Sequence, residues 1–355
     1  MAVLAYVAGG CMLIDWLSLR LDTKACPDWG GWWRLREWGD RILRYCPRTG
    51  VSKWEIAAWD SLRSDSHQLA IKAGGDGFWV QGSPARVMGL GDTVFGAGDA
   101  GRDIVQCART MIEFAARLVY YESVPHYRLW SVTRSDITQN YDLGSAAGVR
   151  VALSELRNIE GGRYRVSQQA GDTVYYSHLS RHRAGKAYAK GPHLIYLLKQ
   201  STYTGCSYSE SDLELAHRLL RLELRLGSKW FHQLSVPWYQ LSWDNLKEQH
   251  DNYFMRMVGV EGIEVTDMGF LDRFIKVAPS EGQGKAAARS WALVQAMGWQ
   301  AARDTMPIRT WYRHQQIWKL AGLGDADISA GRVVSLRRPL IMHPVSSWEE
   351  LRRAA

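Results

Sequence analysis

The chain contains 355 residues, of which 46% are hydrophobic and 23% charged, a balance typical of a soluble globular protein of one or two domains. It excludes a disordered tail, a collagen-like fibre and a small disulfide-stapled domain. Lys and Arg number 44 against 36 Asp and Glu, so the formal net charge is +8, which favours a polyanionic partner such as nucleic acid.

Cysteine and tryptophan usage add further expectations. The five cysteines are scattered without a CxxC pair, which indicates reduced thiols in a cytosolic protein rather than a zinc site or a disulfide framework. No apolar run approaches the roughly 18 residues of a membrane span, so we expect no membrane partner. Most of the 17 tryptophans are expected to pack in the core, and stacking on nucleic-acid bases is the alternative.

The first third of the chain mixes strands with one helix. Residues 1–11 precede a second methionine, and we expect them to form an N-terminal extension outside the fold. Residues 14–21 predict a strand, whereas the Trp-, Arg- and Gly-rich stretch 24–60 supports no assignment. Residues 68–83 predict two strands joined by a glycine-rich turn, and residues 103–120 carry apolar side chains at helical spacing.

The middle of the chain predicts further strands and caps. Residues 130–138 indicate a strand, and Ser145 is expected to cap a helix that runs to about residue 157. Residues 173–178 and 186–190 predict a hairpin with an Arg-rich connection. A capping-box pattern at Ser211 predicts a short helix.

The strongest strand signal lies at residues 220–226, where four leucines alternate without a fault with Arg, Glu and Arg. After it the composition becomes helical, with helices expected near 241–258, 285–302 and 307–321. The coarse prediction is an α+β domain to about residue 235, followed by a smaller helical region.

Charged side chains share one face of each of the two strongest strands. Arg134 and Asp136 are two residues apart, and Glu223 lies between Arg221 and Arg225 at the same spacing. If the two strands are neighbours, Asp136 and Glu223 converge and supply hard oxygen ligands for Mg²⁺ or Mn²⁺. The alternative is a solvated sheet face with cross-strand ion pairs.

A second constellation is Tyr188, which lies between Lys186 and Lys190 on one predicted strand face. Neighbouring ammonium groups favour the phenolate, which is the nucleophilic form of tyrosine. Just upstream lies a cluster suited to a DNA backbone, Arg181, His182 and Arg183. The alternative for Tyr188 is an ordinary strand tyrosine.

The common nucleotide and hydrolase motifs are absent from the sequence. There is no Walker A motif, so we do not expect an ATP-driven motor, and no GxSxG or HExxH motif occurs. Two histidines flanking a single residue, the metal-binding pair of many nicking enzymes, do not occur either.

Six segments occur in an order that resembles a known family. They are IDWLSLRL, GSPARVMGLGDTVFG, SVTRSDITQNYDLGS, SRHRAGKAYAKGPHL, LLRLELRL and MPIRTWYRHQQIWKLAGL. Each is weakly specific alone, but together they resemble the gene-II/X type replication initiators of filamentous single-stranded DNA phages and the related rolling-circle plasmid initiators. The likeness extends from residue 12 to about residue 330.

The resemblance implies an HUH-like endonuclease domain over residues 12–235, with a central antiparallel sheet flanked by helices, and a helical C-terminal region over 236–355. By position, Tyr188 matches the nucleophile and Lys190 the lysine of the family's Tyr-x-Lys motif. The acids implied as metal ligands are Asp136, Glu223 and, with a less certain role, Asp15. Three arginines are implied either to contact phosphate or to brace the carboxylates, namely Arg134, Arg221 and Arg225. Four further residues are implied to contact DNA or phosphate, namely Arg181, His182, Arg183 and Lys186.

One departure concerns the strand that carries Asp136. Plasmid relatives often have a second Asp four residues later, whereas this chain has Asn140 there and Asp142 two residues beyond. This weakens the case for a third carboxylate ligand from that strand.

The implied activity is site-specific nicking and rejoining of DNA through a 5′-phosphotyrosyl link, with Mg²⁺ or Mn²⁺. The implied partners are the double-stranded replicative-form origin, single-stranded DNA, a host helicase and a host polymerase, in the host bacterial cytoplasm, with oligomerisation at the origin left open. The competing hypothesis is a non-catalytic origin-binding or regulatory protein, which has no use for a tyrosine beside a carboxylate pair.

Overall fold

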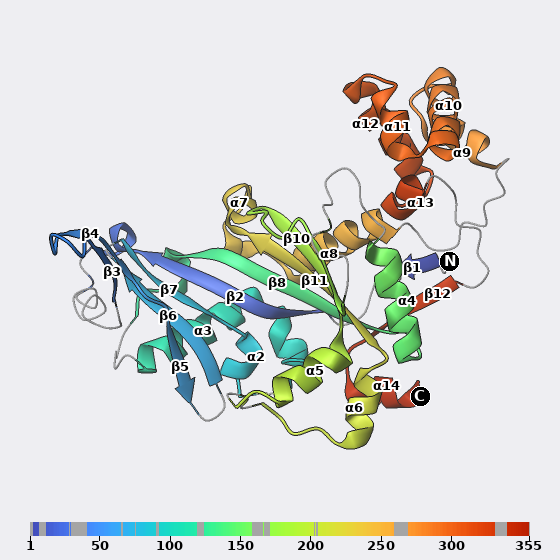
Figure 1. The fold of residues 1–355 in the computed structure, drawn as a ribbon. Coiled ribbons are helices and arrows are strands. Elements are labelled where there is room, and N and C mark those ends of the chain that lie inside the picture. The colour runs from blue at the N-terminus through green and yellow to red at the C-terminus, as the bar shows by residue number, and fades with distance from the viewer. Residues whose placement is uncertain are drawn as a thin grey trace.

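The computed structural model describes residues 3–6, 12–27, 29, 41–64, 67–74, 76–89, 92–118, 124–157, 166, 171–201, 203, 205–258, 269–330 and 339–354. Its centre is an antiparallel sheet in the strand order β5-β6-β7-β2-β8-β11-β10-β9 (Figure 1). These strands are β5 (Asp60–Ser64), β6 (His67–Gly74), β7 (Gly77–Gly82), β2 (Leu13–Asp22), β8 (Trp130–Asp142), β11 (Leu219–Gly227), β10 (Arg183–Ala189) and β9 (Thr173–Tyr176).

Helices cover one face of this sheet. The leucines of β11 that alternate with charged residues are fully buried and join a core with α3 (Ile104–Leu118), α4 (Ala146–Arg157) and α8 (Trp243–Val258). The other face carries the charged members of the same alternation, because successive strand side chains point to opposite faces. The predicted α+β class, with a central antiparallel sheet flanked by helices, is therefore confirmed.

A second hydrophobic core lies in the C-terminal helices. It is built around Trp291, Trp311 and Trp318, whose rings meet edge to face, and Trp318 donates to the carbonyl of Ala287. Figure 1 shows these helices gathered beside the sheet. They are α9 (Gly269–Val277), α10 (Glu281–Met297), α11 (Trp299–Asp304), α12 (Ile308–Leu320) and α13 (Asp325–Ala330).

Both ends of the chain return to the sheet. Strand β12 (Pro339–Val345) pairs with β8, and β1 (Val3–Tyr6) runs parallel to β12. Residues 3–6 of the expected N-terminal extension are thus paired with another strand, and the C-terminal region contains a strand beside its helices. The domain boundary near residue 235 stays a prediction. Helix α8, which lies beyond that boundary, packs on the same core as the sheet.

A third, small cluster closes the end of the sheet near β12. It joins Val94, Phe95, Leu194, Leu219 and Leu351. The helices that contribute to it are α5 (Lys190–Leu198), α6 (Glu210–Ala216) and α14 (Trp348–Arg353). Helix α2 (Pro84–Val87) joins the main core instead, and the single-turn α7 (Ser228–His232) follows β11.

Most predicted elements are present, with local differences. The unassigned stretch contains a separate hairpin, β3 (Arg41–Tyr45) and β4 (Ser52–Ala57). Ser145 caps α4 as predicted, through the backbone N–H of Gly148. The cap of α6 is Ser209 rather than Ser211, because its hydroxyl accepts from the N–H of Asp212 at 3.2 Å. Among the described residues, no helix is long and apolar enough to cross a bilayer.

Candidate active site on the open face of the sheet

Four adjacent strands bring the predicted carboxylates and tyrosine to one face. β11 lies between β8 and β10, with Asp136 opposite Arg225 and Thr138 opposite Glu223, so Asp136 and Glu223 are diagonal neighbours. On the other side of β11, Tyr188 lies opposite Arg221 and Lys186 opposite Glu223. The convergence expected if the two strands were neighbours is therefore present.

Asp15 reaches this face because of an irregularity in β2. The register with β8 shifts between Ile14 and Trp16, leaving Asp15 as the extra residue of a bulge. Ile14 and Leu17 are both fully buried in the core, so Asp15 and Trp16 between them both lie on the open face. The bulge thus adds a third carboxylate to the face that holds Asp136.

Asp136 is held by a two-pronged ion pair. Nε of Arg134 donates to Oδ1 at 2.8 Å, and Nη2 of the same guanidinium donates to Oδ2. Burial raises the pKa of Asp136, and Arg134 opposes that effect. The arginine two residues away therefore offsets part of the cost of burying this carboxylate and holds it in place through two hydrogen bonds.

Glu223 is a second buried carboxylate whose pKa is raised. Burial, and then the nearby charge of Asp136, raise its pKa to about 7, while Lys186 acts in the opposite direction. The Lys186 ammonium lies 4.0 Å from its Oε2. The effects of burial and of Asp136 on Glu223 are thus only partly offset by the nearby Lys186.

Tyr188 is buried, with 3% of its surface exposed. The Lys186 Nζ lies 4.0 Å from the centre of its ring and the Lys190 Nζ 5.9 Å. Burial nevertheless raises the pKa of Tyr188, and Glu223 and Asp15 add to this, against a lowering by Arg221. The expectation that the lysines would favour the phenolate is not met in the protein alone, because desolvation outweighs them.

Lys190 opens α5 and is 2% exposed. Burial holds its pKa well below the usual range, and the nearby Arg221 adds to that lowering. His193, one turn further on, stacks edge to face on Tyr188 at 5.0 Å. Burial, and then the charge of Lys190, lower the pKa of His193 to about 3, so the imidazole beside the tyrosine favours its uncharged form.

Arg221 is 1% exposed, and its guanidinium contacts several protein groups, Tyr188 among them. Nε donates to Oδ1 of Asn140 at 2.8 Å, Nη1 lies 3.3 Å from Oδ2 of Asp15, and Nη2 donates to the carbonyl of Val94. With these partners the buried guanidinium can brace Asp15, which is one of the two roles expected for Arg221, and its contact with phosphate stays a prediction.

Asn140 explains the departure from the acid-rich pattern. Its Nδ2 donates to the carbonyl of Val94 at 2.7 Å while its Oδ1 accepts from Arg221. Only an amide can donate and accept in this way, so the residue ties β8 to the loop that follows α2. Asp142 is engaged elsewhere, since its carboxylate pairs with Arg218.

The remaining predicted phosphate contacts have other neighbours in the protein alone. Arg225 donates to the carbonyls of His178 and Ser180, so it holds the β9–β10 connection. Arg181 is exposed, and Arg183 donates to Gln249. His182 is partly buried, and its carbonyl accepts from the N–H of Gly227.

A cavity of about 550 Å³ opens beside Glu223 and Lys186. It is lined by Arg134, Tyr175, His178, Ala184, Gly185, Lys186, Glu223 and Arg225. Three basic side chains, Arg134, Lys186 and Arg225, line it together with the carboxylate of Glu223, which suits an anionic group such as a phosphodiester. Trp16, Asn140 and His193 lie at the site but were not predicted from the sequence as site residues. Only Asn140 could have been noticed there, as a departure from the family pattern.

A divalent metal finds two suitable donors. Asp136 and Glu223 offer carboxylate oxygens on one face, and Mg²⁺ commonly uses one or two carboxylates with water and substrate phosphate. The raised pKa of Glu223 beside Asp136 fits a place where a cation would offset negative charge. Within the described ranges, however, no three His, Cys, Asp or Glu side chains are grouped to hold a metal, so Asp15 as a third ligand stays a prediction.

Comparison with known proteins gives one family match. The family of phage replication-associated proteins of the gene II type, represented by their N-terminal part, matches residues 13–250. No curated protein matches the chain. A solved rolling circle replication initiator protein from Geobacillus stearothermophilus is 15% identical, with 62% of this chain and 75% of that one covered and a TM-score of 0.26, too slight a likeness to carry an argument. Because the family match covers more than half of the chain and all four strands of the site, the chain belongs to the gene II type family of phage replication-associated proteins.

Proposed function

We propose that this protein nicks one strand of a phage origin and later rejoins the displaced strand, and so initiates and terminates rolling-circle replication. The observation that carries the proposal is the position of Tyr188, opposite Arg221 and diagonal to Glu223 on a face shared with Asp136. A structural tyrosine would not need three carboxylates and two lysines around it. Membership of the gene II type replication-associated family supports the same class of reaction.

The chemical step transfers a phosphodiester to the tyrosine. The Tyr188 Oη bonds to the scissile phosphorus as the bond from phosphorus to the 3′ oxygen breaks, the phenolic proton leaves, and the 3′ oxygen takes up a proton. The product is a 5′-phosphotyrosyl link and a free 3′-OH that a host polymerase can extend. The phosphodiester is conserved, so a later 3′-OH can reverse the step without ATP.

The protein's own groups prepare this step. Arg134, Lys186 and Arg225 line the cavity and would bind the phosphate oxygens, with Arg225 also fixing the β9–β10 connection. Arg221 orients Asp15 and, by its positive charge, lowers the pKa of Tyr188. Neutralising the charges of Glu223 and Asp15 would remove two of the effects that raise that pKa.

Asp136 and Glu223 would hold Mg²⁺ or Mn²⁺. Such an ion would supply Lewis-acid polarisation of a phosphate oxygen. The further parts of the proposal are action on the replicative form of a filamentous phage in the host cytoplasm, cooperation with a host helicase, and assembly of several copies at the origin.

The test uses the parent phage's supercoiled replicative DNA and the full chain. Wild type with Mg²⁺ or Mn²⁺ should give nicked circles and a protein–DNA adduct on a denaturing gel, and EDTA should abolish both. Tyr188→Phe should abolish both, whereas Tyr196→Phe, an exposed tyrosine on α5 outside the cavity, should retain them. DNA binding by wild type without cleavage under all metals would reject the proposal and favour a non-catalytic origin-binding protein.

A further inference from the structure

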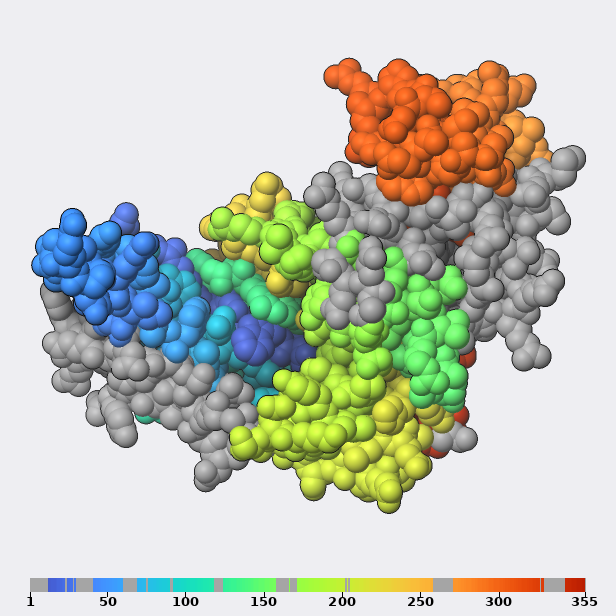
Figure 2. Space-filling view, in the orientation of Figure 1, coloured from blue at the N-terminus to red at the C-terminus, as the bar shows by residue number. Residues whose placement is uncertain are grey.

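The open face of the sheet continues beyond the carboxylates toward β7 and β6. Along β2 the side chains that follow Asp15 on this face are Trp16, Ser18 and Arg20, because the opposite positions enter the core. Arg20 lies opposite Trp79 of β7, and Trp79 lies opposite Lys72 of β6. In the space-filling view, the dark blue surface of β2 is visible between the lighter blue strands and the green side of the sheet (Figure 2).

Aromatic rings and cations alternate along this face. The Arg134 guanidinium lies 5.7 Å from the Trp16 ring, and Arg20 lies 5.3 Å from that of Trp79. Lys72 lies 5.4 Å from the Trp79 ring and 5.9 Å from that of Trp59, which is 45% exposed. Tryptophans placed on an open face, rather than among the core helices, have ring surface available to a ligand.

The face is also organised by polar contacts. The Trp16 indole donates to Ser18 at 3.2 Å, and the Ser18 hydroxyl donates to Gln81 at 3.3 Å. Arg20 pairs with Asp22 and Asp76, at 3.3 and 3.0 Å, so part of its charge is already balanced. Stacking on the rings, rather than net charge, therefore has to supply most of the affinity of this face for a nucleic acid.

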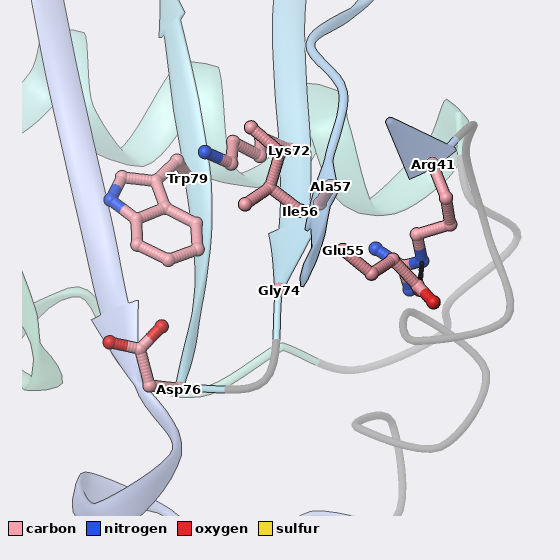
Figure 3. Close-up of a pocket in the computed structure, with 8 residues that line it drawn as sticks. All are labelled: Arg41, Glu55, Ile56, Ala57, Lys72, Gly74, Asp76 and Trp79. Atoms are coloured by element: carbon pink, nitrogen blue, oxygen red, sulfur yellow. Dashed lines mark ion pairs between the residues drawn. The ribbon is translucent and has the colours of Figure 1, made fainter. Parts of the chain in front are cut away.

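The row ends at a cavity of about 490 Å³ beside the β3–β4 hairpin. Figure 3 shows the Trp79 ring and the Lys72 side chain projecting from neighbouring strands, with Ile56 of the hairpin next to Lys72 and Arg41 on the far side. Trp16 and Arg20 are four residues apart on β2, so the row extends about 13 Å from the carboxylate site before it reaches Trp79.

We infer that this row of Trp16, Trp79 and Trp59, with Arg134, Arg20 and Lys72, is a track for single-stranded DNA that leads to Tyr188. Bases stack on indole faces regardless of sequence, while Arg and Lys side chains meet the intervening phosphates. The inference rests on the proposed function, since it supplies the path of the strand that Tyr188 would cleave.

The test measures binding of fluorescein-labelled oligothymidylate by anisotropy, with the full chain in a Tyr188→Phe background so that no covalent capture contributes. Trp79→Ala and Trp59→Ala should each weaken binding about 5- to 10-fold, and Trp79→Phe, which keeps a ring, should lose much less. Lys72→Gln should lower the slope of log affinity against log salt by about 0.7. Tyr312→Ala, an exposed aromatic on α12, should have no effect, and thermal unfolding should confirm that each variant is folded.

The proposed track would be wrong if folded Trp79→Ala and Trp59→Ala bound oligothymidylate as tightly as the parent protein. It would also be wrong if Tyr312→Ala lost as much affinity as they do. A loss of duplex binding in the same variants, with single-stranded binding retained, would overturn it too. The two proposals fail separately. If wild type forms an adduct on Tyr188 but the tryptophan variants bind oligothymidylate normally, the nicking proposal holds and the track is wrong. If the variants bind oligothymidylate more weakly but wild type forms no adduct, the track holds and the nicking proposal is wrong.

Discussion

Arg221 and Asn140 are joined across the β8–β11 pair by a hydrogen bond of 2.8 Å from Nε to Oδ1. The same guanidinium contacts Asp15, and the same amide donates to the Val94 carbonyl. The carboxylate of the bulged strand β2 is thus positioned through an arginine that an amide holds in place. This relationship links three strands and one loop behind the site.

Asn140→Asp is expected to destabilise the protein rather than add a useful ligand. The new carboxylate could still accept from Arg221, but it would face the Val94 carbonyl with no proton to donate. An unsatisfied buried group of this kind costs about 1–3 kcal/mol, which urea unfolding would measure. A variant as stable as wild type, with higher nicking activity, would show that Asn140 occupies a ligand position.

Arg134→Gln should lower the free energy of unfolding by about 1–3 kcal/mol, because Asp136 is buried and would lose both charge-assisted hydrogen bonds. Adding Asp136→Asn should restore part of the loss, so urea unfolding of the double mutant would reveal the coupling. Arg353→Gln breaks an exposed pair with Glu349 and should change nothing measurable. Additive effects of Arg134→Gln and Asp136→Asn would contradict the pairing.

Acid should destabilise the protein through His250. This residue is fully buried, its ring nitrogen lies 3.3 Å from the Leu222 carbonyl, and burial lowers its pKa to about 4 from 6.5. As the pH falls, His250 therefore takes up a proton in the unfolded chain before it does so in the folded protein. The free energy of unfolding is at its full value above pH 6.5 and falls by on the order of 3 kcal/mol as the pH drops toward 4. His250→Gln should flatten the unfolding free energy between these pH values, and the exposed His232→Gln should not. Equal acid sensitivity in wild type and His250→Gln would refute the assignment.

Gly185 should tolerate no side chain. A Cβ there would lie 2.6 Å from Cε1 of Tyr253, in the layer between β10 and α8. Gly185→Ala is expected to cost about 1–3 kcal/mol, since a packed ring must move. Gly282→Ala in α10, where a Cβ meets nothing within 4 Å, is the matched control and should be neutral or slightly stabilising. Thermal melts compare the two, and equal effects would contradict the close approach.

Regular periodicity accounts for what could be predicted. The alternation in β11 defined its buried and open faces, and the spacing of Arg134 and Asp136 placed them together on β8. The bulge at Asp15 was not predictable, because a one-residue irregularity follows from pairing with β8 rather than from local sequence. The burial of Arg221 was equally hidden, since it depends on the loop carbonyl of Val94 from a distant segment. Pairing of β12 with β8 joins residues so far apart that no local pattern signals it.

The central claim is that Tyr188 becomes covalently linked to the 5′ end of the nicked strand. The most direct measurement incubates wild type with Mg²⁺ and supercoiled replicative DNA, digests the adduct with nuclease and protease, and locates the nucleotide phosphate by peptide mass spectrometry. The account predicts a single modified peptide, with the phosphate on Tyr188. Modification of Tyr175 or another tyrosine, or nicked circles with no modified peptide, would contradict it.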